Sequence, residues 1–338
     1  MEANMSEGFI TDVSGVVVGQ SENMDALTGC TVVICKNGAV GGIDQRGGAP
    51  GTRETDAIKP MHLVEKLHAV VLSGGSAFGL DAAGGVMKFL EEEGVGFNTG
   101  YAKVPIVSAA VLYDLAIGSP DIRPDFDMGY EACKSASDQS FYIGNYGAGT
   151  GASVGKILGP GQAMKSGIGT ASIDIGGGVI VGAIMAVNAF GDIVNPETGR
   201  IIAGARTVKK GPIAIGKDSN FANSMQTLRT IAGRTNLKFA SMQNTMIGVV
   251  ATNAKLTKEE ANKVAQMAQD GIAMTVRPAH TMFDGDTIFA MATNMKSADV
   301  NAVGAFAAQA VANAIVNGVK SASSAAGLPA YEDLNINE

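Results

Sequence analysis

The chain has 338 residues, of which 46% are hydrophobic and 17% charged, and its formal net charge is −7. This composition excludes intrinsically disordered and fibrous proteins, which are poorer in apolar residues or repeat a short period. A folded chain of this length buries roughly three quarters of its unfolded surface. No Pro-rich, Ser-rich or like-charged linker interrupts residues 1–338, so we expect one compact unit. The acidic excess and the lack of a basic run predict that nucleic acid is not a partner.

The N-terminus, the cysteines and the lengths of the apolar runs support further exclusions. The first seven residues are polar and acidic, unlike an export signal, so a cytoplasmic protein with reduced thiols is expected. Cys30, Cys35 and Cys133 show no metal-ligand spacing with one another or with the three histidines, which predicts no metal site. The apolar runs are about half as long as a membrane span requires. We therefore expect no membrane partner and interpret the runs as buried strands.

The first half of the chain predicts short strands followed by a helix. Three β-branched runs are bounded by turn-forming residues and are predicted strands: 15–19, 31–35 and 69–73. Residues 77–93 place apolar side chains at helical spacing, and Gly94 is a candidate cap at the C-terminal end of that helix. A further apolar run, residues 178–187, predicts another buried strand.

The second half predicts two long helices. Thr257 and Glu260 form a capping box that begins a helix ending near residue 276. Residues 298–319 predict an Ala-rich helix with almost no charge, which suits close packing on other elements or on a second subunit. Strands and helices are thus mixed along the whole chain, and the fold class is α/β.

Two glycine-rich segments are similar to nucleotide or nucleophile motifs without fitting them. Residues 144–156 suggest a phosphate loop, but the Walker pattern needs Ser or Thr after its Gly-Lys pair, and Lys156 is followed by Ile157. Ser76 follows a strand and a glycine turn, but its glycines have the wrong spacing for a nucleophile elbow. We favour tight packing, or backbone N–H groups presented to a developing oxyanion, for these segments.

Thr245 begins a predicted strand, residues 245–253, after a polar segment. A threonine in this position is ordinarily structural. If the peptide bond before Thr245 were cut, however, the residue would carry both a hydroxyl nucleophile and an α-amine, whose ordinary pKa of about 7.7–8.0 suits a general base. That combination is the chemistry of N-terminal-nucleophile hydrolases.

Asp284 and Asp286 place two carboxylates two residues apart, on one side of an extended segment. Two carboxylates that close raise the pKa of one of them, leaving one group able to accept a proton and the other able to orient a partner. The alternative is a solvated Asp-Gly turn or a weak cation site. The apolar residues 288–291 that follow predict a loop leading into a core strand.

Together these segments resemble the P1 family of self-processing peptidases and amidases, peptidase family S58. The resemblance extends over nearly the whole chain and is carried by several motifs: residues 10–13, 29–33, 46–55, 73–80, 147–150, 165–170, 186–188 and 283–287. It implies an αββα sandwich of two sheets between helix layers. It also implies that the precursor cleaves itself between Asn244 and Thr245, giving segments 1–244 and 245–338.

The resemblance implies roles for individual residues. Thr245 matches the nucleophile, and Asp284 and Asp286 match the carboxylates that position it in the branch that hydrolyses nylon oligomers. Lys165 matches a lysine that stabilises negative charge or tunes the Thr245 amine. Asn188 matches an amide that donates to the oxyanion of the tetrahedral intermediate, a donor typically worth about 3 kcal/mol. Without the family, buried and satisfied polar residues are the default interpretation of Lys165 and Asn188.

The resemblance also implies the class of substrate and the assembly. Tyr113 matches an active-site tyrosine that contacts substrate. Because Thr245 and the Asp pair resemble the amidase branch, the expected substrates are small amides, peptides or oligomers of ω-amino acids such as 6-aminohexanoate. No metal or organic cofactor is implied, and a homotetramer of processed subunits is expected.

Two other functions are compatible with the same residues. Residues 244–247 and 251–254 also resemble the self-cleaving ornithine acetyltransferases, which pass the same acyl ester to an amine. The third alternative is a binding or structural protein that is never processed, in which Thr245 merely begins a strand.

Overall fold

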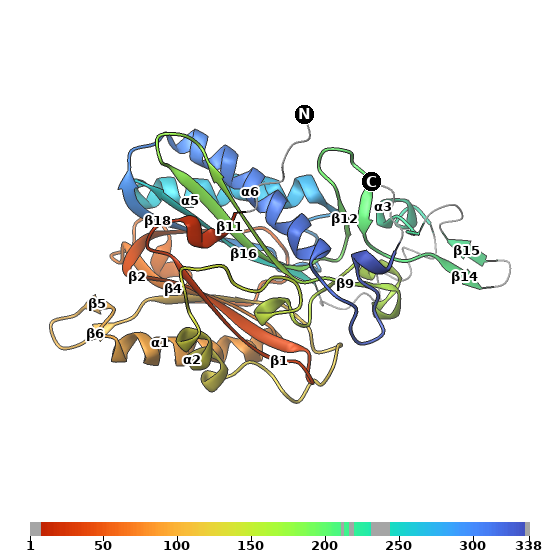
Figure 1. Cartoon of the computed structure of the whole chain (residues 1–338), viewed down its shortest axis with the longest axis horizontal. Helices are drawn as coiled ribbons and strands as arrows, with labels where there is room; N and C mark the ends of the chain where they lie inside the picture. Colours follow the sequence, from red (N-terminus) through yellow and green to blue (C-terminus); the bar gives the residue numbers. More distant parts are fainter. Residues whose placement is uncertain (1–7, 211–212, 216–219, 231–243, 335–338) are drawn as a thin grey trace.

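The computed structural model describes residues 8–210, 213–215, 220–230 and 244–334. Two layers of strands lie between two layers of helices, with α5 (Lys258–Thr275) and α6 (Val300–Lys320) on one side and α1 (Ala82–Glu92) and α2 (Phe126–Lys134) on the other (Figure 1). The predicted αββα architecture is confirmed.

The strands of both layers belong to one nine-stranded sheet, where the sequence predicts two separate sheets. In order across the sheet the strands are β10 (Ile168–Asp174), β11 (Ile180–Asn188), β16 (Thr245–Ala254), β18 (Thr287–Lys296), β2 (Thr28–Gln45), β4 (Lys66–Ser73), β7 (Val107–Val111) and β3 (Thr52–Arg53), with β1 (Val17–Asn23) paired to β2. The strand that joins the layers is β2, whose 18 residues pair with β4 at 30–34 and 39–40 and with β18 at 40–45. The long strand thus lets a single hydrogen-bonded ladder fold into two facing leaves.

Three apolar cores separate the four layers. The central core contains Ile247 and Phe289 from one leaf together with Val70 and Leu112 from the other. An outer core joins alternate residues of β11, β16 and β18 to α5 and α6, and a second outer core joins β2 and β4 to α1 and α2. Because strand side chains alternate between faces, a strand buried on both faces is apolar throughout, as the continuous apolar runs predict.

Most predicted elements are confirmed, with one difference. Thr257 caps α5, with the capping box to Glu260 fully formed. The helix predicted over residues 77–93 begins instead as a 3-10 helix, η3 (Ser76–Asp81), before α1. The tight turn before it explains the change, because a Cβ at Gly79 would lie 1.9 Å from the Gly74 carbonyl oxygen. Gly94 has φ +67° and ends α1 as predicted.

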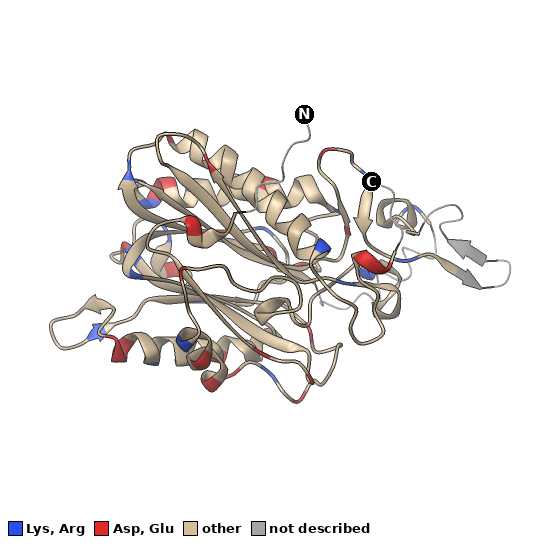
Figure 2. Cartoon of the chain, viewed as in Figure 1, with Lys and Arg blue, Asp and Glu red and all other residues tan. Residues whose placement is uncertain are grey.

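The Ala-rich helix α6 is long and apolar enough, by length and composition, to cross a membrane. In this fold, however, 67% of its most apolar window is buried. Its small residues allow close packing on the sheet, since a Cβ at Gly169 on β10 would lie 2.2 Å from the Ala314 carbonyl oxygen. The helix therefore has the environment of a core helix. In Figure 2 the positions of charged residues lie mainly on the helices and loops, and the strands are largely free of them.

The smaller elements are β5 (Phe97–Asn98), β6 (Lys103–Val104), β8 (Ser153–Val154), β9 (Met164–Lys165), β12 (Asp192–Val194), β13 (Ile201–Ala203), β14 (Val208–Lys210), β15 (Ile213–Ile215), β17 (Val276–Arg277) and α3 (Ser224–Thr227).

Candidate active site

Thr245 is the first residue of β16 and lies between two paired strands. The antiparallel register of β11 places Asn188 opposite Thr245, and the parallel strand β18 begins at Thr287, opposite Ile247. Thr245 is only 5% exposed. Sheet register therefore brings together Asn188, Thr245 and the segment just before β18, which are far apart in the sequence.

The peptide group between Asn244 and Thr245 is held at two points. The backbone N–H of Gly285 donates to the Asn244 carbonyl oxygen over 3.1 Å. The hydroxyl of Thr245 donates to the same oxygen. A Cβ at position 285 would lie 2.9 Å from Thr245 Oγ1 and 2.7 Å from the Ala49 carbonyl oxygen, so glycine is required there. The nucleophile candidate, the carbonyl and an N–H donor thus meet at one point.

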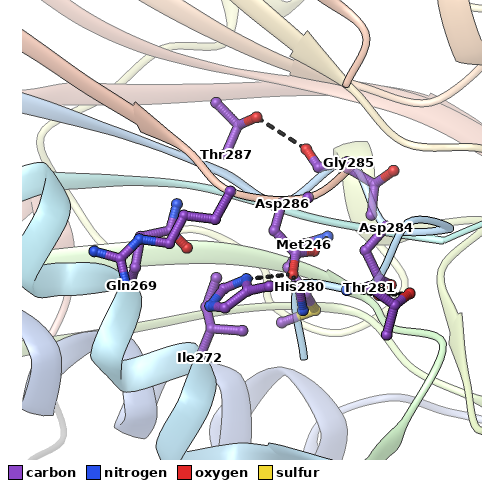
Figure 3. Close-up of polar contacts among 12 residues, drawn as sticks. Met246, Gln269, Ile272, His280, Thr281, Asp284, Gly285, Asp286 and Thr287 are labelled. Carbon is purple, nitrogen blue, oxygen red and sulfur yellow. Dashed lines mark hydrogen bonds and ion pairs between the residues drawn. The ribbon is translucent and has the colours of Figure 1, made fainter. Parts of the chain in front are cut away.

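Asp284 and Asp286 flank Gly285, and both are buried (Figure 3). Asp284 accepts hydrogen bonds from the Phe190 N–H over 3.3 Å and from the N–H and hydroxyl of Thr281 over 2.9 and 2.5 Å. Burial, followed by the neighbouring charge of Asp286, raises the pKa of Asp284 to about 6. The expected pairing of two carboxylates, one with a raised pKa, is therefore present.

Asp286 connects β16 to a histidine. One carboxylate oxygen accepts the N–H of Met246, the residue after Thr245, over 2.9 Å. The other accepts the backbone N–H of His280 over 3.1 Å and lies 2.8 Å from its ring Nδ1 (Figure 3). His280 has φ +55°, a left-handed conformation that few residues other than glycine adopt, although histidine does so more often than most. In the sequence, the only signal for His280 is its position six residues before Asp286.

Asn188 joins a second buried network. Its Oδ1 accepts Lys156 Nζ over 2.6 Å and the Ser153 N–H over 3.1 Å, and its Nδ2 donates to the Tyr113 carbonyl oxygen over 3.2 Å. Burial lowers the pKa of Lys156 to about 7, while the carboxylates of Asp284 and Asp114 oppose the shift. Asn188 therefore contacts both Tyr113 and a lysine.

That lysine is Lys156. Lys165, which the resemblance assigns to stabilising negative charge or tuning the Thr245 amine, has other contacts, and its role stays a prediction. Lys165 Nζ donates to the carbonyl oxygens of Gly149, over 3.1 Å, and Ser166. Burial lowers the pKa of Lys165 to about 7, with Asp114 opposing. In the sequence analysis Lys156 only excludes a Walker motif. The one sequence feature that could have pointed to Lys156 is its place at the end of the glycine-rich segment 144–156.

A cavity of about 500 Å³ opens in front of Thr245. It is lined by residues of the loop before β3, of η3, and of the end of β7: Ala49, Pro50, Gly51, Ser76, Ala77, Val111, Leu112, Tyr113 and Thr245. Tyr113 lines the cavity, and its role in binding substrate stays a prediction; Ser76 also lines it, without a nucleophile elbow. Within the described residues no cluster of His, Cys, Asp or Glu could hold a metal ion.

The family model of peptidase family S58 matches residues 8–331. The chain belongs to peptidase family S58. A relative in Mycobacterium leprae, described as an uncharacterised aminopeptidase, is 40% identical over 95% of this chain and 92% of its own length. A 6-aminohexanoate-oligomer endohydrolase of Kocuria sp. is 30% identical over 91% of this chain and 85% of its own. This S58 protein is therefore a hydrolase of amide or peptide bonds, and the acyltransferase and binding-protein alternatives are not favoured.

Solved structures confirm the fold of this S58 protein. The L-aminopeptidase D-Ala-esterase/amidase of Ochrobactrum anthropi, described as a variant of the Ntn hydrolase fold, has a TM-score of 0.68 at 18% identity, covering 93% of this chain and 86% of that chain. A Burkholderia sp. β-aminopeptidase has a TM-score of 0.63 at 22% identity, covering 94% and 88%.

Proposed function

We propose that this S58 protein cleaves itself between Asn244 and Thr245 and then hydrolyses amides with Thr245 as an N-terminal nucleophile. The observation that carries the proposal is the Asn244 carbonyl oxygen, which accepts both the Gly285 N–H, over 3.1 Å, and the Thr245 hydroxyl. A carbonyl polarised by a fixed donor, with a hydroxyl beside it, is arranged for nucleophilic attack.

Self-cleavage then follows in two steps. Thr245 Oγ1 attacks the Asn244 carbonyl carbon, and the C–N bond breaks as the proton passes to the Thr245 nitrogen, leaving an ester. Water hydrolyses that ester, which releases Asn244 with a free carboxylate and restores the hydroxyl of Thr245. Thr245 now carries a free α-amine whose ordinary pKa of about 7.7–8.0 suits a general base.

Turnover repeats the same chemistry on a substrate. The Thr245 amine takes the proton of Oγ1 as it attacks the amide carbonyl and returns it to the leaving amine, and water releases the acyl group. The Gly285 N–H is a fixed donor for the developing oxyanion. Asp286 holds the Met246 N–H at 2.9 Å and so fixes the backbone beside the nucleophile. The oxyanion role of the Asn188 amide stays a prediction, because this amide donates to the Tyr113 carbonyl oxygen in this structure.

Lys156 is a second candidate for the role that the resemblance implies for Lys165, and the role of Lys165 stays a prediction. The Nζ of Lys156 lies 2.6 Å from Asn188 Oδ1. Burial lowers the pKa of Lys156, and the negative charge of Asp284 opposes that shift. A lysine with a pKa of about 7 changes its charge near neutral pH and tunes the groups around it.

The expected substrates are small amides or peptides, including oligomers of ω-amino acids. The 6-aminohexanoate-oligomer endohydrolase named among the relatives supports that class. The homotetramer and the cytoplasmic location stay predictions, as does the division into segments 1–244 and 245–338.

Intact mass under denaturing conditions tests the proposal directly. The wild-type protein and Thr245→Ser, which keeps a hydroxyl, should give two fragments, with residue 245 at the new N-terminus. Thr245→Ala should give one uncut chain. Thr252→Ala is the matched control, because Thr252 is buried in the same strand and donates instead to the Ile180 carbonyl oxygen over 2.8 Å. An uncut, folded wild-type chain would refute self-cleavage.

A further inference from the structure

Asp114 is a buried carboxylate that the mechanism above does not use. It follows Tyr113 in the chain and is 3% exposed. Its Oδ2 accepts the Thr28 hydroxyl over 2.7 Å, and its Oδ1 accepts the Gly75 N–H, also over 2.7 Å. Burying a carboxylate is costly unless donors or a cation stabilise its charge, so the surroundings of Asp114 indicate its role.

The two glycine-rich segments noted in the sequence converge on this carboxylate. A Cβ at Gly74 would lie 2.1 Å from Asp114 Oδ2, and a Cβ at Gly151 would lie 2.8 Å from the same atom. Both distances are shorter than real Cβ contacts, so glycine is required at each position. The segments 73–80 and 144–156 therefore make room for a charged side chain, although neither has the spacing of a nucleotide or nucleophile motif.

Asp114 faces a lysine of the active site. Asp114 and Lys156 both line a small cavity of about 10 Å³, which has room for about one water molecule and cannot hold a substrate. Burial lowers the pKa of Lys156 to about 7, while the charges of Asp284 and Asp114 oppose the shift. Burial raises the pKa of Asp114, and its hydrogen bonds and the charge of Lys156 oppose that shift. Each of the two groups thus stabilises the charged form of the other.

Lys156 connects this carboxylate to the nucleophile. Its Nζ donates to the side-chain oxygen of Asn188 over 2.6 Å and to the backbone oxygen of the same residue over 3.2 Å. Asn188 in turn lies opposite Thr245 in the sheet. The charge of Asp114 also opposes the lowered pKa of Lys165, but the Nζ of Lys165 donates to backbone carbonyl oxygens. The path from Asp114 to the site therefore runs through Lys156.

We propose, on the basis of the function proposed above, that Asp114 is a positioning residue that keeps Lys156 a cation against Asn188. The charge matters because a charged donor forms a shorter and stronger hydrogen bond than a neutral one. A lysine that keeps its proton holds the Asn188 side chain, and with it the end of β11 opposite Thr245, in one orientation. Asp114 acts through the lysine and not on the substrate itself.

The pH profile of turnover tests this inference, because a purely structural role would not move it. The substrate is a linear 6-aminohexanoate trimer, and kcat/KM is measured from about pH 5 to 9. In the self-cleaved wild type, kcat/KM should fall on the alkaline side as Lys156 loses its proton, and Lys156→Met should lack this fall. Asp114→Asn keeps an acceptor for the Gly75 N–H but loses the charge, so the alkaline fall should move to lower pH by about one unit or more.

Asp192→Asn is the matched control. Asp192 is 1% exposed and accepts the Ser224 N–H and hydroxyl over 2.6 and 2.8 Å and the Ala205 N–H over 2.9 Å. Burial raises the pKa of Asp192, and these hydrogen bonds oppose the shift. Loss of this buried charge should leave the alkaline fall at its wild-type pH. Circular dichroism and intact mass establish that each variant folds and cleaves itself.

Two further variants separate the charge of Asp114 from its packing. In the Lys156→Met background, Asp114→Asn should not change the pH profile, because the lysine through which it acts is gone. Thr28→Val keeps Asp114 but removes a donor to its carboxylate, so the alkaline fall should move in the same direction by a smaller amount.

The outcomes distinguish this inference from the function on which it rests. An active, self-cleaved wild type whose alkaline fall keeps its pH in both Asp114→Asn and Thr28→Val would overturn the role of Asp114 and leave self-cleavage standing. A wild-type chain that stays uncut and inactive would refute the proposed function, and this inference with it.

Discussion

Gly285→Ala is the substitution that most directly tests the geometry of self-cleavage. The new Cβ would lie 2.7 Å from the Ala49 carbonyl oxygen and 2.9 Å from Thr245 Oγ1, closer than real Cβ contacts. Because one of these atoms is backbone, the loop carrying residue 285 must shift. Overpacking of this kind costs about 1–3 kcal/mol of stability.

The shift also moves a hydrogen-bond donor. The Gly285 N–H lies 3.1 Å from the Asn244 carbonyl oxygen, and loss of one positioned oxyanion donor slows a reaction about 100- to 1000-fold. We therefore expect self-cleavage of Gly285→Ala to be slower than wild type by about a hundredfold or more, since both the donor and the hydroxyl are displaced.

The assay is the time course of fragment formation, followed by intact mass, in freshly synthesised protein. Gly161→Ala is the matched control, because a Cβ there has nothing within 4 Å and the residue lacks a left-handed φ. Circular dichroism and urea unfolding establish that both variants fold. A folded Gly285→Ala that cleaves itself at the wild-type rate would refute the assignment of this N–H.

Four further predictions concern Lys156, Lys165, Asp284 and His280. Lys156→Met should reduce amide turnover about a hundredfold, as loss of a charged group bonded within an active site does, whereas Lys165→Met should leave turnover within about threefold. The pKa of Lys165 is lowered to about 7 in the folded chain. Above that pH the unfolded chain therefore binds more protons than the folded chain, and the free energy of unfolding rises with pH. Urea unfolding of Lys165→Met from pH 6 to 9 should show a shallower rise than the wild type. The pKa of Asp284 is raised from 3.8 to about 6 in the folded chain. Between these two pH values the folded chain binds more protons than the unfolded chain, so the free energy of unfolding falls as pH rises. Asp284→Asn should flatten that fall in urea unfolding measured between pH 4 and 6. His280 Nδ1 lies 2.8 Å from Asp286, and His280→Asn keeps an amide donor near that position and tolerates φ +55°, so its kcat should match the wild type. The kcat of His280→Gln should be about tenfold lower. Equal losses of kcat in the two variants would show that the Nδ1 contact is unimportant.

The sequence by itself determined the layers of this fold. The runs that became β4 and β11 are apolar at successive positions, and a strand with that pattern must be buried on both faces. The capping box at Thr257 located the start of α5, because it satisfies backbone donors locally and needs no tertiary partner. Residue type and short spacing made Thr245 and the Asp pair candidates, and the family resemblance then implied their roles.

Tertiary structure alone decided which distant groups meet. The register of β11 with β16 places Asn188 opposite Thr245, and the end of the glycine-rich loop presents Lys156 to Asn188. The sequence analysis gave Lys156 no role, because the position of a lysine in the chain does not show which distant side chain it contacts. The Gly285 N–H was invisible for a different reason: a backbone donor carries no residue signature, and only the path of the loop aims it at the Asn244 carbonyl.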